Sequence, residues 1–220
     1  MMLADLPALR ALDESERSRL LGAGRLRRFA RREVVFHEGD RGDCLHLILE
    51  GRVALRVSTP SGDEVALSLL CRGEIFGELA VVDDDACRAV TALALEPTRT
   101  LAVDGVVLRR LRRRNPGIEA MVTDALAAQV RRLSATVLEL LRQPVDKRVA
   151  RRLADLAPLY RSGAAQVEIP LTQDDLASFA GTTRATANRA LRALASGEVI
   201  SLARGRITVV DHDRLLLAAR

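Results

Sequence analysis

Glycine-centred turns punctuate the first half of the chain so closely that only short strands fit between them. The triplets EGD, RGD, EGR, SGD and RGE all fall within residues 38–74. The runs between them are apolar or alternate in polarity, as in VALRV, which is typical of half-buried strands. We therefore expect strands at Leu45–Leu49, Val53–Val57 and Glu64–Leu70, arranged in an antiparallel sandwich or barrel.

After Thr100 the apolar period changes from two residues to about 3.6. The segment VDGVVLRRLRRRNPG indicates a short helix that ends before Pro116, and residues 117–142 indicate a long one. On the long helix, valine and leucine alternate at steps of four and three, which favours a parallel two-stranded coiled coil. We interpret this seam as a dimer interface, although a helix lying on its own domain's core would give the same pattern. The seam residues are Leu126, Val130, Leu133, Val137 and Leu140.

Pro144 interrupts the helical pattern and predicts a kink or hinge. Beyond it the sequence indicates a helix over 145–161, two shorter helices over 173–179 and 183–195, and a terminal helix. Short strands are expected near 167–170, 199–202 and 206–210. The chain should therefore be an α+β protein. We expect a β-rich domain over residues 1–115, a connecting helix and hinge over 116–143, and a second domain over 144–220.

The stretch LTQDDLASFAGTTRATANRALRAL has the pattern of a helix-turn-helix. Thr172 and Thr183 stand where each helix would be capped, and Gly181 suits the tight turn between them. Residues 183–195 contain no acid, and their outer face is polar and basic, as a helix that reads DNA requires. Two strands around the Arg-Gly-Arg turn would form a wing beside it. The candidate DNA-binding residues are Thr172, Thr183, Arg184, Thr186, Asn188, Arg189, Arg192, Arg204 and Arg206.

The net charge of +5 is concentrated in the C-terminal third. From Pro144 onward there are 12 basic and 8 acidic residues, against 22 basic and 21 acidic before it. A basic C-terminal domain agrees with a polyanionic partner, although the imbalance is weak by itself. All basic residues except Lys147 are arginine, which indicates an arginine-rich coding background and lowers the weight of any single arginine.

Several classes of protein are disfavoured by what the sequence lacks. The chain opens on a capped amphipathic helix rather than a signal peptide, and no apolar run is long enough to span a membrane. Its three cysteines do not form a disulfide framework, so we expect a soluble, cytoplasmic protein. Catalysis is not expected, because the three histidines are scattered and no nucleophile triad or phosphate loop is present. The acidic run Asp83–Asp85 could bind a metal, but we favour a solvated loop and expect no metal.

The stretch FGELAVVDDDACRA sets a glutamate and an arginine ten residues apart, at Glu78 and Arg88. A carboxylate is a suitable acceptor for a hydroxyl group, and a guanidinium binds a phosphate diester through two parallel hydrogen bonds. The two side chains form either a surface ion pair or a site that holds one small ligand from two ends of a loop. If no ligand were bound, a buried arginine would need another partner.

Taken together, these segments resemble the family of the cyclic AMP receptor protein and the fumarate-nitrate reduction regulator (the CRP/FNR family), over nearly the full chain. The resemblance lies in EGDRGDCLHLILEGRVAL, in FGELA with the following CRAVTA, in the long helix, and in the helix-turn-helix with its wing. It implies a cyclic-nucleotide-binding β-roll, a long dimerisation helix and a winged helix-turn-helix. It also implies a homodimeric transcription regulator with cyclic AMP as effector. The implied partners are a palindromic double-stranded operator, a second copy of the chain and, as a further candidate, RNA polymerase.

The resemblance also assigns residues of the cyclic-nucleotide pocket. Glu78 would accept from the ribose hydroxyl and Arg88 would pair with the cyclic phosphate. Gly77 and Leu79 would donate backbone hydrogen bonds, and Ala89 stands where many bacterial members have serine or threonine. On the long helix, Thr136 matches an adenine-contacting threonine, and Arg132, one turn earlier, is a second candidate.

Two departures limit the transfer of detailed roles. Ala89 argues against cyclic GMP, because threonine at this position is associated with cyclic GMP preference in related kinases. Ala185 follows Arg184 where the family often has glutamate, so the usual operator half-site cannot be assumed. A different sensor also stays open, whether a thiol switch at Cys87, haem bound through His37, His46 or a cysteine, or no effector at all. An iron–sulfur cluster would need a group of cysteines that the N-terminal region lacks.

Overall fold

The computed structural model describes residues 6–59, 62, 64–79, 87–161 and 166–220. The chain divides into two compact units. The first holds the described residues of 1–57 and 67–133, and the second holds those of 58–66 and 134–220. Among the described residues, no helix combines the length and apolarity needed to cross a bilayer.

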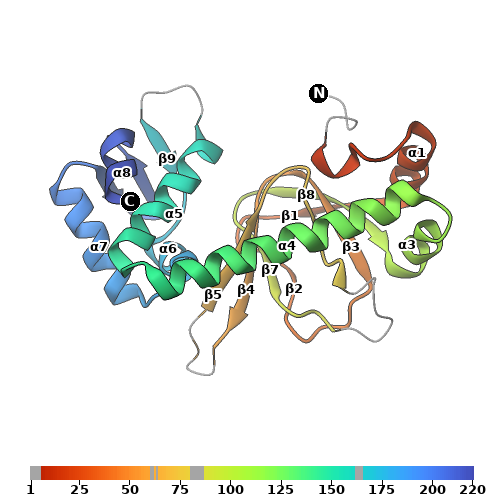
Figure 1. The fold of residues 1–220 in the computed structure, drawn as a ribbon, viewed down its shortest axis with the longest axis horizontal. Helices are drawn as coiled ribbons and strands as arrows, with labels where there is room; N and C mark the ends of the chain where they lie inside the picture. Colours follow the sequence, from red (N-terminus) through yellow and green to blue (C-terminus); the bar gives the residue numbers. More distant parts are fainter. Residues whose placement is uncertain (1–5, 60–61, 63, 80–86, 162–165) are drawn as a thin grey trace. The chain divides into compact units, whose positions relative to one another are not determined.

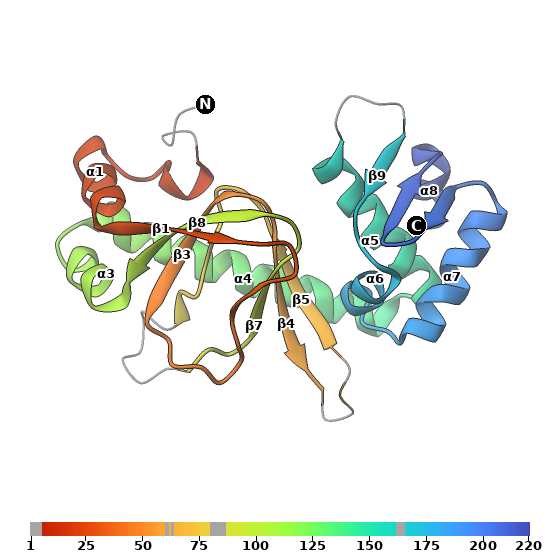
Figure 2. The same cartoon turned by 180° about the vertical axis from the view of Figure 1, so that it is seen from behind.

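The first unit is built around two four-stranded antiparallel sheets, ordered β1-β8-β3-β6 and β2-β7-β4-β5 (Figures 1 and 2). This is the β-roll that the glycine turns predict. Its strands are β1 (Gly24–Phe29), β2 (Val34–Phe36), β3 (Cys44–Glu50), β4 (Val53–Ser58), β5 (Glu64–Leu70), β6 (Ile75–Phe76), β7 (Thr91–Ala94) and β8 (Thr98–Asp104). Its helices are η2 (Pro7–Leu9), α1 (Glu14–Ala23), α3 (Gly105–Arg112) and the first part of α4 (Pro116–Arg142).

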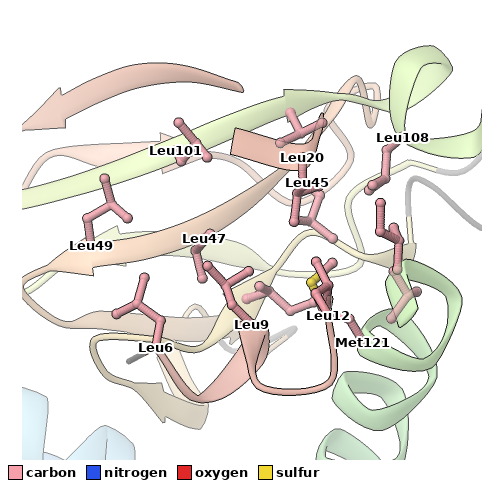
Figure 3. Close-up of a cluster of buried hydrophobic side chains, with 14 residues drawn as sticks. Leu6, Leu9, Leu12, Leu20, Leu45, Leu47, Leu49, Leu101, Leu108 and Met121 are labelled. Atoms are coloured by element: carbon pink, nitrogen blue, oxygen red, sulfur yellow. The ribbon is translucent and has the colours of Figure 1, made fainter. Parts of the chain in front are cut away.

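A leucine-rich core joins the N-terminal segment, the β1-β8-β3-β6 sheet and the start of α4 (Figure 3). Leu6, Leu9 and Leu12 pack against alternate residues of β3, namely Leu45, Leu47 and Leu49. Because successive strand side chains point to opposite faces, the intervening Ile48 belongs to a second cluster with Phe36, Phe76 and Leu55. Two of the chain's five aromatic residues, Phe36 and Phe76, lie in this second cluster.

One strand and one boundary differ from the sequence prediction. Strand β1 was not predicted, because residues 25–28 are all exposed and give no alternation of burial. It forms through backbone pairing with β8 along its whole length, a tertiary effect that local polarity does not encode. The helix predicted to begin at Val103 begins instead at Gly105, because β8 extends to Asp104 and the Asp104 carboxylate caps α3 by accepting from Val107 N.

The second unit contains α5 (Val145–Tyr160), α6 (Gln173–Phe179), α7 (Arg184–Ser196) and α8 (His212–Ala218). A three-stranded antiparallel sheet accompanies these helices, ordered β10-β11-β9. The strands are β9 (Val167–Ile169), β10 (Ile200–Ala203) and β11 (Arg206–Val209). The fold class predicted from the sequence, an antiparallel roll followed by a long helix and a winged helix-turn-helix, is confirmed.

Two arginines of α5 tie the end of α4 to the turn of the helix-turn-helix. Arg148 is buried and donates to the backbone carbonyls of Gln143 (2.9 Å), Ala180 (3.0 Å) and Gly181 (3.3 Å). Arg152 donates to Phe179 O (2.9 Å) and pairs with Glu139 of α4 (2.5 Å). Carbonyls at helix C-termini are favourable partners for a cation. The last turns of α4 are therefore fixed to the helix-turn-helix within the second unit.

Candidate functional site

A pocket of about 300 Å³ lies within the first unit, between strands of the roll and α4. It contains all five residues predicted from the FGELA segment and its arginine: Gly77, Glu78, Leu79, Arg88 and Ala89. The pocket is completed by Phe36, Leu55, Leu67, Cys87, Val90, Leu126, Gln129, Val130 and Leu133. Its wall is thus mostly apolar, with one acid and one base placed on it.

Arg88 is almost completely buried, with 3% of its side chain exposed. Its Nη2 donates to Cys44 O (2.8 Å) and pairs with the exposed Asp43 carboxylate (3.1 Å), and its Nη1 donates to Gly77 O (3.2 Å). The guanidinium also lies over the Phe36 ring, 4.1 Å from its centroid. Asp43 and the two carbonyls are therefore the partners that a buried arginine requires in the absence of a ligand.

One donor of the Arg88 guanidinium has no acceptor in the part of the chain that the structure describes. Its Nε is buried and has no hydrogen-bond partner among the described residues. A buried N–H without an acceptor is costly.

Gly77 is required by both backbone conformation and space. Its φ of +81° is unfavourable for residues with a side chain. A Cβ placed there would meet Arg88 Nη1 at 2.5 Å and Cys44 O at 3.1 Å. The glycine of the FGELA segment therefore allows the arginine to pass close to the backbone.

Burial raises the pKa of Glu78 above its ordinary value. Backbone hydrogen bonds from Glu78 and Gly77 lower the pKa, as do the charges of Arg132 and Arg88, but they offset only part of the effect of burial. Glu78 lines the pocket, and 8% of the residue is exposed. A carboxylate in this setting gains from a hydroxyl donor on a ligand, because hydrogen bonds to the charged form offset its desolvation.

Arg132 and Thr136, the two further ligand candidates, are not among the described residues that line this pocket. Arg132 lines a second cavity of about 270 Å³ in the first unit and pairs with Glu74 at 3.0 Å. Thr136 is half-buried on α4 and belongs to the second unit. Sequence reasoning missed Gln129, which does line the pocket. Gln129 is a polar residue in the otherwise apolar run from Ala125 to Val130. This break in the apolar run was the available signal.

The residues considered for haem or thiol sensing are engaged in other ways. His46 bonds through one ring nitrogen to Thr100 Oγ1 (3.0 Å) and through the other to Cys44 Sγ (3.3 Å). Burial and the Arg88 charge lower the pKa of His46 to about 4, so the ring is neutral. Burial and a hydrogen bond with Asp43 raise the pKa of Cys44 to about 11, so the thiol keeps its proton.

Cys87 is exposed. The Arg88 guanidinium contacts the sulfur of a different cysteine, Cys44, at 3.5 Å. The parts of the chain that the structure describes contain no group of three or more metal-binding side chains. The aspartate run at 83–85 lies outside the described residues.

In the second unit, the helix-turn-helix has the caps and turn expected of it. The Thr172 hydroxyl accepts from Asp175 N (3.1 Å) in a capping box, and the Thr183 hydroxyl accepts from Thr186 N (3.3 Å). Gly181 has φ +58°, the left-handed conformation that suits the turn between the helices. Thr172 is thus used to cap α6, in addition to its predicted role in contacting DNA.

The outer face of α7 carries the predicted basic and polar residues. Arg184, Arg189 and Arg192 are exposed, whereas Thr186 and Asn188 are half-buried. Arg184 pairs with Asp174 at 3.2 Å, and the Asn188 amide donates to Gln173. These are contacts between exposed or half-buried side chains, which a DNA backbone or base edge can replace.

The predicted wing is also present, as the hairpin of β10 and β11. Arg204 and Arg206 are exposed at its turn, and Arg206 pairs with Glu168 at 3.3 Å. The described residues of the second unit thus bring a basic helix and a basic hairpin into one domain.

The residues of the predicted dimer seam differ in how far they are exposed to solvent. Leu126 and Leu133 are half-buried and line the pocket. Val130 also lines the pocket but is 62% exposed, and Val137 and Leu140 are exposed as well. Leu138 and Leu141, which sequence reasoning did not include, are 57% and 78% exposed on the same helix. The second half of α4 therefore carries a strongly apolar surface in the single chain.

Comparison with known proteins defines the class of protein. Residues 26–115 match the cyclic nucleotide-binding domain, and residues 147–217 match the Crp-like helix-turn-helix domain. A ligand-binding roll joined to a DNA-binding module is the organisation of a transcription regulator, not of an enzyme.

The chain belongs to the CRP/FNR family of transcription regulators. It is 32% identical over 195 residues to the CRP-like cAMP-activated global transcriptional regulator of Mycobacterium tuberculosis, covering 87% of each chain. It is 35% identical over 176 residues to the cyclic AMP receptor protein of Thermus thermophilus, covering 80% of this chain and 79% of the relative. Its fold matches that of CLP, a global regulator from Xanthomonas campestris described as c-di-GMP responsive. The TM-score is 0.80 at 21% identity, over 90% of this chain and 99% of the other.

The ion pair between Asp43 and Arg88 generates a prediction. Asp43→Asn should lower the melting temperature of the ligand-free protein and tighten the binding of an anionic ligand to Arg88, because the anion no longer competes with a carboxylate. Cyclic AMP, which two relatives carry in their names, is the test ligand. The gain should not exceed about fivefold, since Asp43 is largely exposed and such pairs contribute about 1 kcal/mol or less. Calorimetric titration measures the affinity.

Glu50→Gln is the matched control, since it breaks the exposed Glu50–Arg99 pair in the same unit. It should leave the affinity unchanged. Weaker binding by Asp43→Asn would mean that Asp43 positions Arg88 rather than competing with the ligand.

Proposed function

We propose that the chain is a homodimeric, cytoplasmic transcription regulator controlled by cyclic AMP bound in the β-roll. Residues 1–115 act as the sensor domain, 116–143 as the dimerisation helix and hinge, and 144–220 as the DNA-binding domain. The observation that carries the proposal is that Glu78 and the buried Arg88 line one mostly apolar pocket. In the bound state this arginine holds the cyclic phosphate and Glu78 accepts from the ribose hydroxyl.

The size and lining of the pocket support a cyclic mononucleotide. Its volume of about 300 Å³ is at the lower end of small-molecule sites, which span about 300–1,000 Å³. A cyclic dinucleotide has twice as many atoms and is a poorer fit. The apolar wall suits the faces of a base, whereas Glu78 and Arg88 suit the sugar and phosphate. Two relatives at 32% and 35% identity carry cyclic AMP in their names, which supports the choice of nucleotide.

The alternative is the same regulator with another effector or none. A thiol switch would be expected at the exposed Cys87, because burial raises the pKa of both Cys44 and Cys71. A haem ligand at His46 would have to break a hydrogen bond to Thr100 or Cys44. Both observations favour the nucleotide over the redox effectors.

In the DNA-bound state, the recognition helix α7 enters the major groove and the wing follows the backbone. Arg184 and Arg189 read base edges, with Thr186 and Asn188 beside them. Arg192, Arg204 and Arg206 bind phosphates, and Thr172 and Thr183 contribute at the helix starts. Two copies joined along α4 read the two halves of a palindrome, and RNA polymerase is a further partner.

Arg88→Leu should weaken cyclic AMP binding by about a hundredfold or more, because it removes the charged donor for the phosphate. The protein should remain a folded dimer with a lower melting temperature, because the carbonyls of Cys44 and Gly77 lose their donor. Isothermal titration calorimetry is the measurement, because Trp is absent and Tyr160 is the single tyrosine.

Arg41→Leu is the control for this test, as it removes an exposed charge from the neighbouring segment. Its affinity should stay that of the wild type. Unchanged affinity in Arg88→Leu itself would refute the assignment of the pocket.

Val137→Glu should weaken dimerisation by about a hundredfold or more, because it brings two carboxylates together at the seam. Val137 is 53% exposed and does not line the pocket, so the fold and the ligand site should survive. Analytical ultracentrifugation over a concentration series measures the change. Ala135→Glu, an exposed position two residues away, should stay dimeric. A persistent Val137→Glu dimer would place the interface elsewhere.

Arg184→Ala should weaken binding to the specific operator by about 1–3 kcal/mol and relax specificity at one base pair, through the loss of one bidentate base contact. Fluorescence anisotropy with operator and scrambled DNA at several salt concentrations measures both effects. Arg214→Ala, an exposed arginine on α8, controls for the loss of charge. Equal weakening on both DNAs with a smaller salt slope would make Arg184 a phosphate contact instead.

A further inference from the structure

Gln129 is an unusual residue in the ligand pocket. It lies on α4 beside Leu126, Val130 and Leu133, which form the apolar side of the pocket. Among the described lining side chains, its amide is the one neutral group that offers strong hydrogen bonds, because the other polar groups are Glu78, Arg88 and the thiol of Cys87.

Two hydrogen bonds fix the orientation of this amide. Arg132 Nη2 donates to Gln129 Oε1 (3.1 Å), and the Ser68 hydroxyl donates to the same oxygen (3.3 Å). A guanidinium can only donate, so the atom that faces Arg132 must be the carbonyl oxygen and not the nitrogen. Both lone pairs of Oε1 are thereby used, and the remaining capacity of the side chain lies in the two N–H groups of Nε2.

The two donors that hold Gln129 are themselves anchored. Arg132 Nη1 pairs with Glu74 (3.0 Å), and the second carboxylate oxygen of Glu74 accepts from Cys71 N (2.8 Å). Ser68 is buried on β5. The amide is thus held from the helix and from the sheet before any ligand arrives, as a preorganised recognition group requires.

No described residue accepts a hydrogen bond from Gln129 Nε2. If a ligand filled the pocket without an acceptor at this point, the amide would lose water and gain nothing in exchange. A ligand with an acceptor there is therefore selected over one without it. Since Glu78 and Arg88 account for the sugar and phosphate, the acceptor belongs to the remaining part of the ligand.

We propose that Gln129 is a specificity-determining residue that donates from Nε2 to a ring nitrogen of the bound nucleotide's purine. This inference rests on the proposed function, because it requires a cyclic purine nucleotide in the pocket. The residues Arg132, Glu74 and Ser68 act as positioning residues for the amide, and not as ligand contacts.

The test compares cyclic AMP with its 1-deaza, 3-deaza and 7-deaza analogues and with 2′-deoxy cyclic AMP. Each is titrated by calorimetry against the full-length wild type and against Gln129→Met, which keeps the volume and removes the amide. One deaza analogue should bind the wild type roughly 5- to 15-fold more weakly than cyclic AMP, the effect of one hydrogen bond. That penalty should disappear in Gln129→Met, and the other analogues should behave alike in both proteins.

A third variant separates a contact from a structural role. Gln129→Glu can still accept from Arg132 and Ser68 but offers no donor to the base. It should also lose the penalty for the same analogue, whereas a purely structural Gln129 would leave the penalty unchanged in both variants.

The experiment distinguishes a failure of the Gln129 proposal from a failure of the proposed function. If no deaza analogue discriminates between wild type and Gln129→Met, or if the 2′-deoxy analogue does, the proposal is wrong. If the wild type binds cyclic AMP in no titration, the proposed function fails and the specificity assignment fails with it.

Discussion

The burial of one positive charge governs the organisation of the ligand pocket. Arg88 is removed from water, so the surrounding chain must supply compensation. Asp43 provides the counter-charge, Cys44 and Gly77 provide carbonyls, and the Phe36 ring covers the guanidinium face. The same charge helps to keep the neighbouring His46 neutral. The glycine in the FGELA segment follows from this arrangement, because a Cβ there would collide with the guanidinium.

Helix α4 is the second organising element, because its residues serve both units. Leu126, Gln129 and Leu133 line the pocket in the first unit. Further along the chain, Glu139 of α4 and Gln143, just beyond its end, bond to Arg152 and Arg148, which hold the turn of the helix-turn-helix in the second unit. A shift of α4 at the pocket would therefore be transmitted along the continuous helix to the turn of the helix-turn-helix. A ligand uses this route only through a difference in its affinity for two arrangements of the helix.

The sequence predicted most of the fold and the charged part of the site, because both depend on local patterns. Glycine turns, the change of period and the capping threonines define elements within a few residues. Strand β1 was missed because its exposed side chains carry no pattern, and its partner β8 lies far along the chain. Asp43 was taken only as part of a turn, and its role as the counter-ion of Arg88 depends on a contact across 45 residues. Gln129 was visible as a polar residue beside the apolar seam, but its orientation in the pocket depends on contacts such as that with Ser68, 61 residues away.

The two sets of polar contacts in the pocket favour different features of a ligand. At one end, a phosphate must compete with the Asp43 carboxylate for Arg88, so binding there depends on charge. The free energy gained from the phosphate is offset in part by the loss of the Asp43 pair. On the α4 side, an amide with its oxygen already occupied can accept nothing and can only donate. The contact with Arg88 favours any anion. The contact with Gln129 discriminates between anions, because it favours those with a hydrogen-bond acceptor in the part of the ligand away from the charge. Discrimination between nucleotides would therefore lie mainly with the helix, which is also the element that continues into the DNA-binding unit.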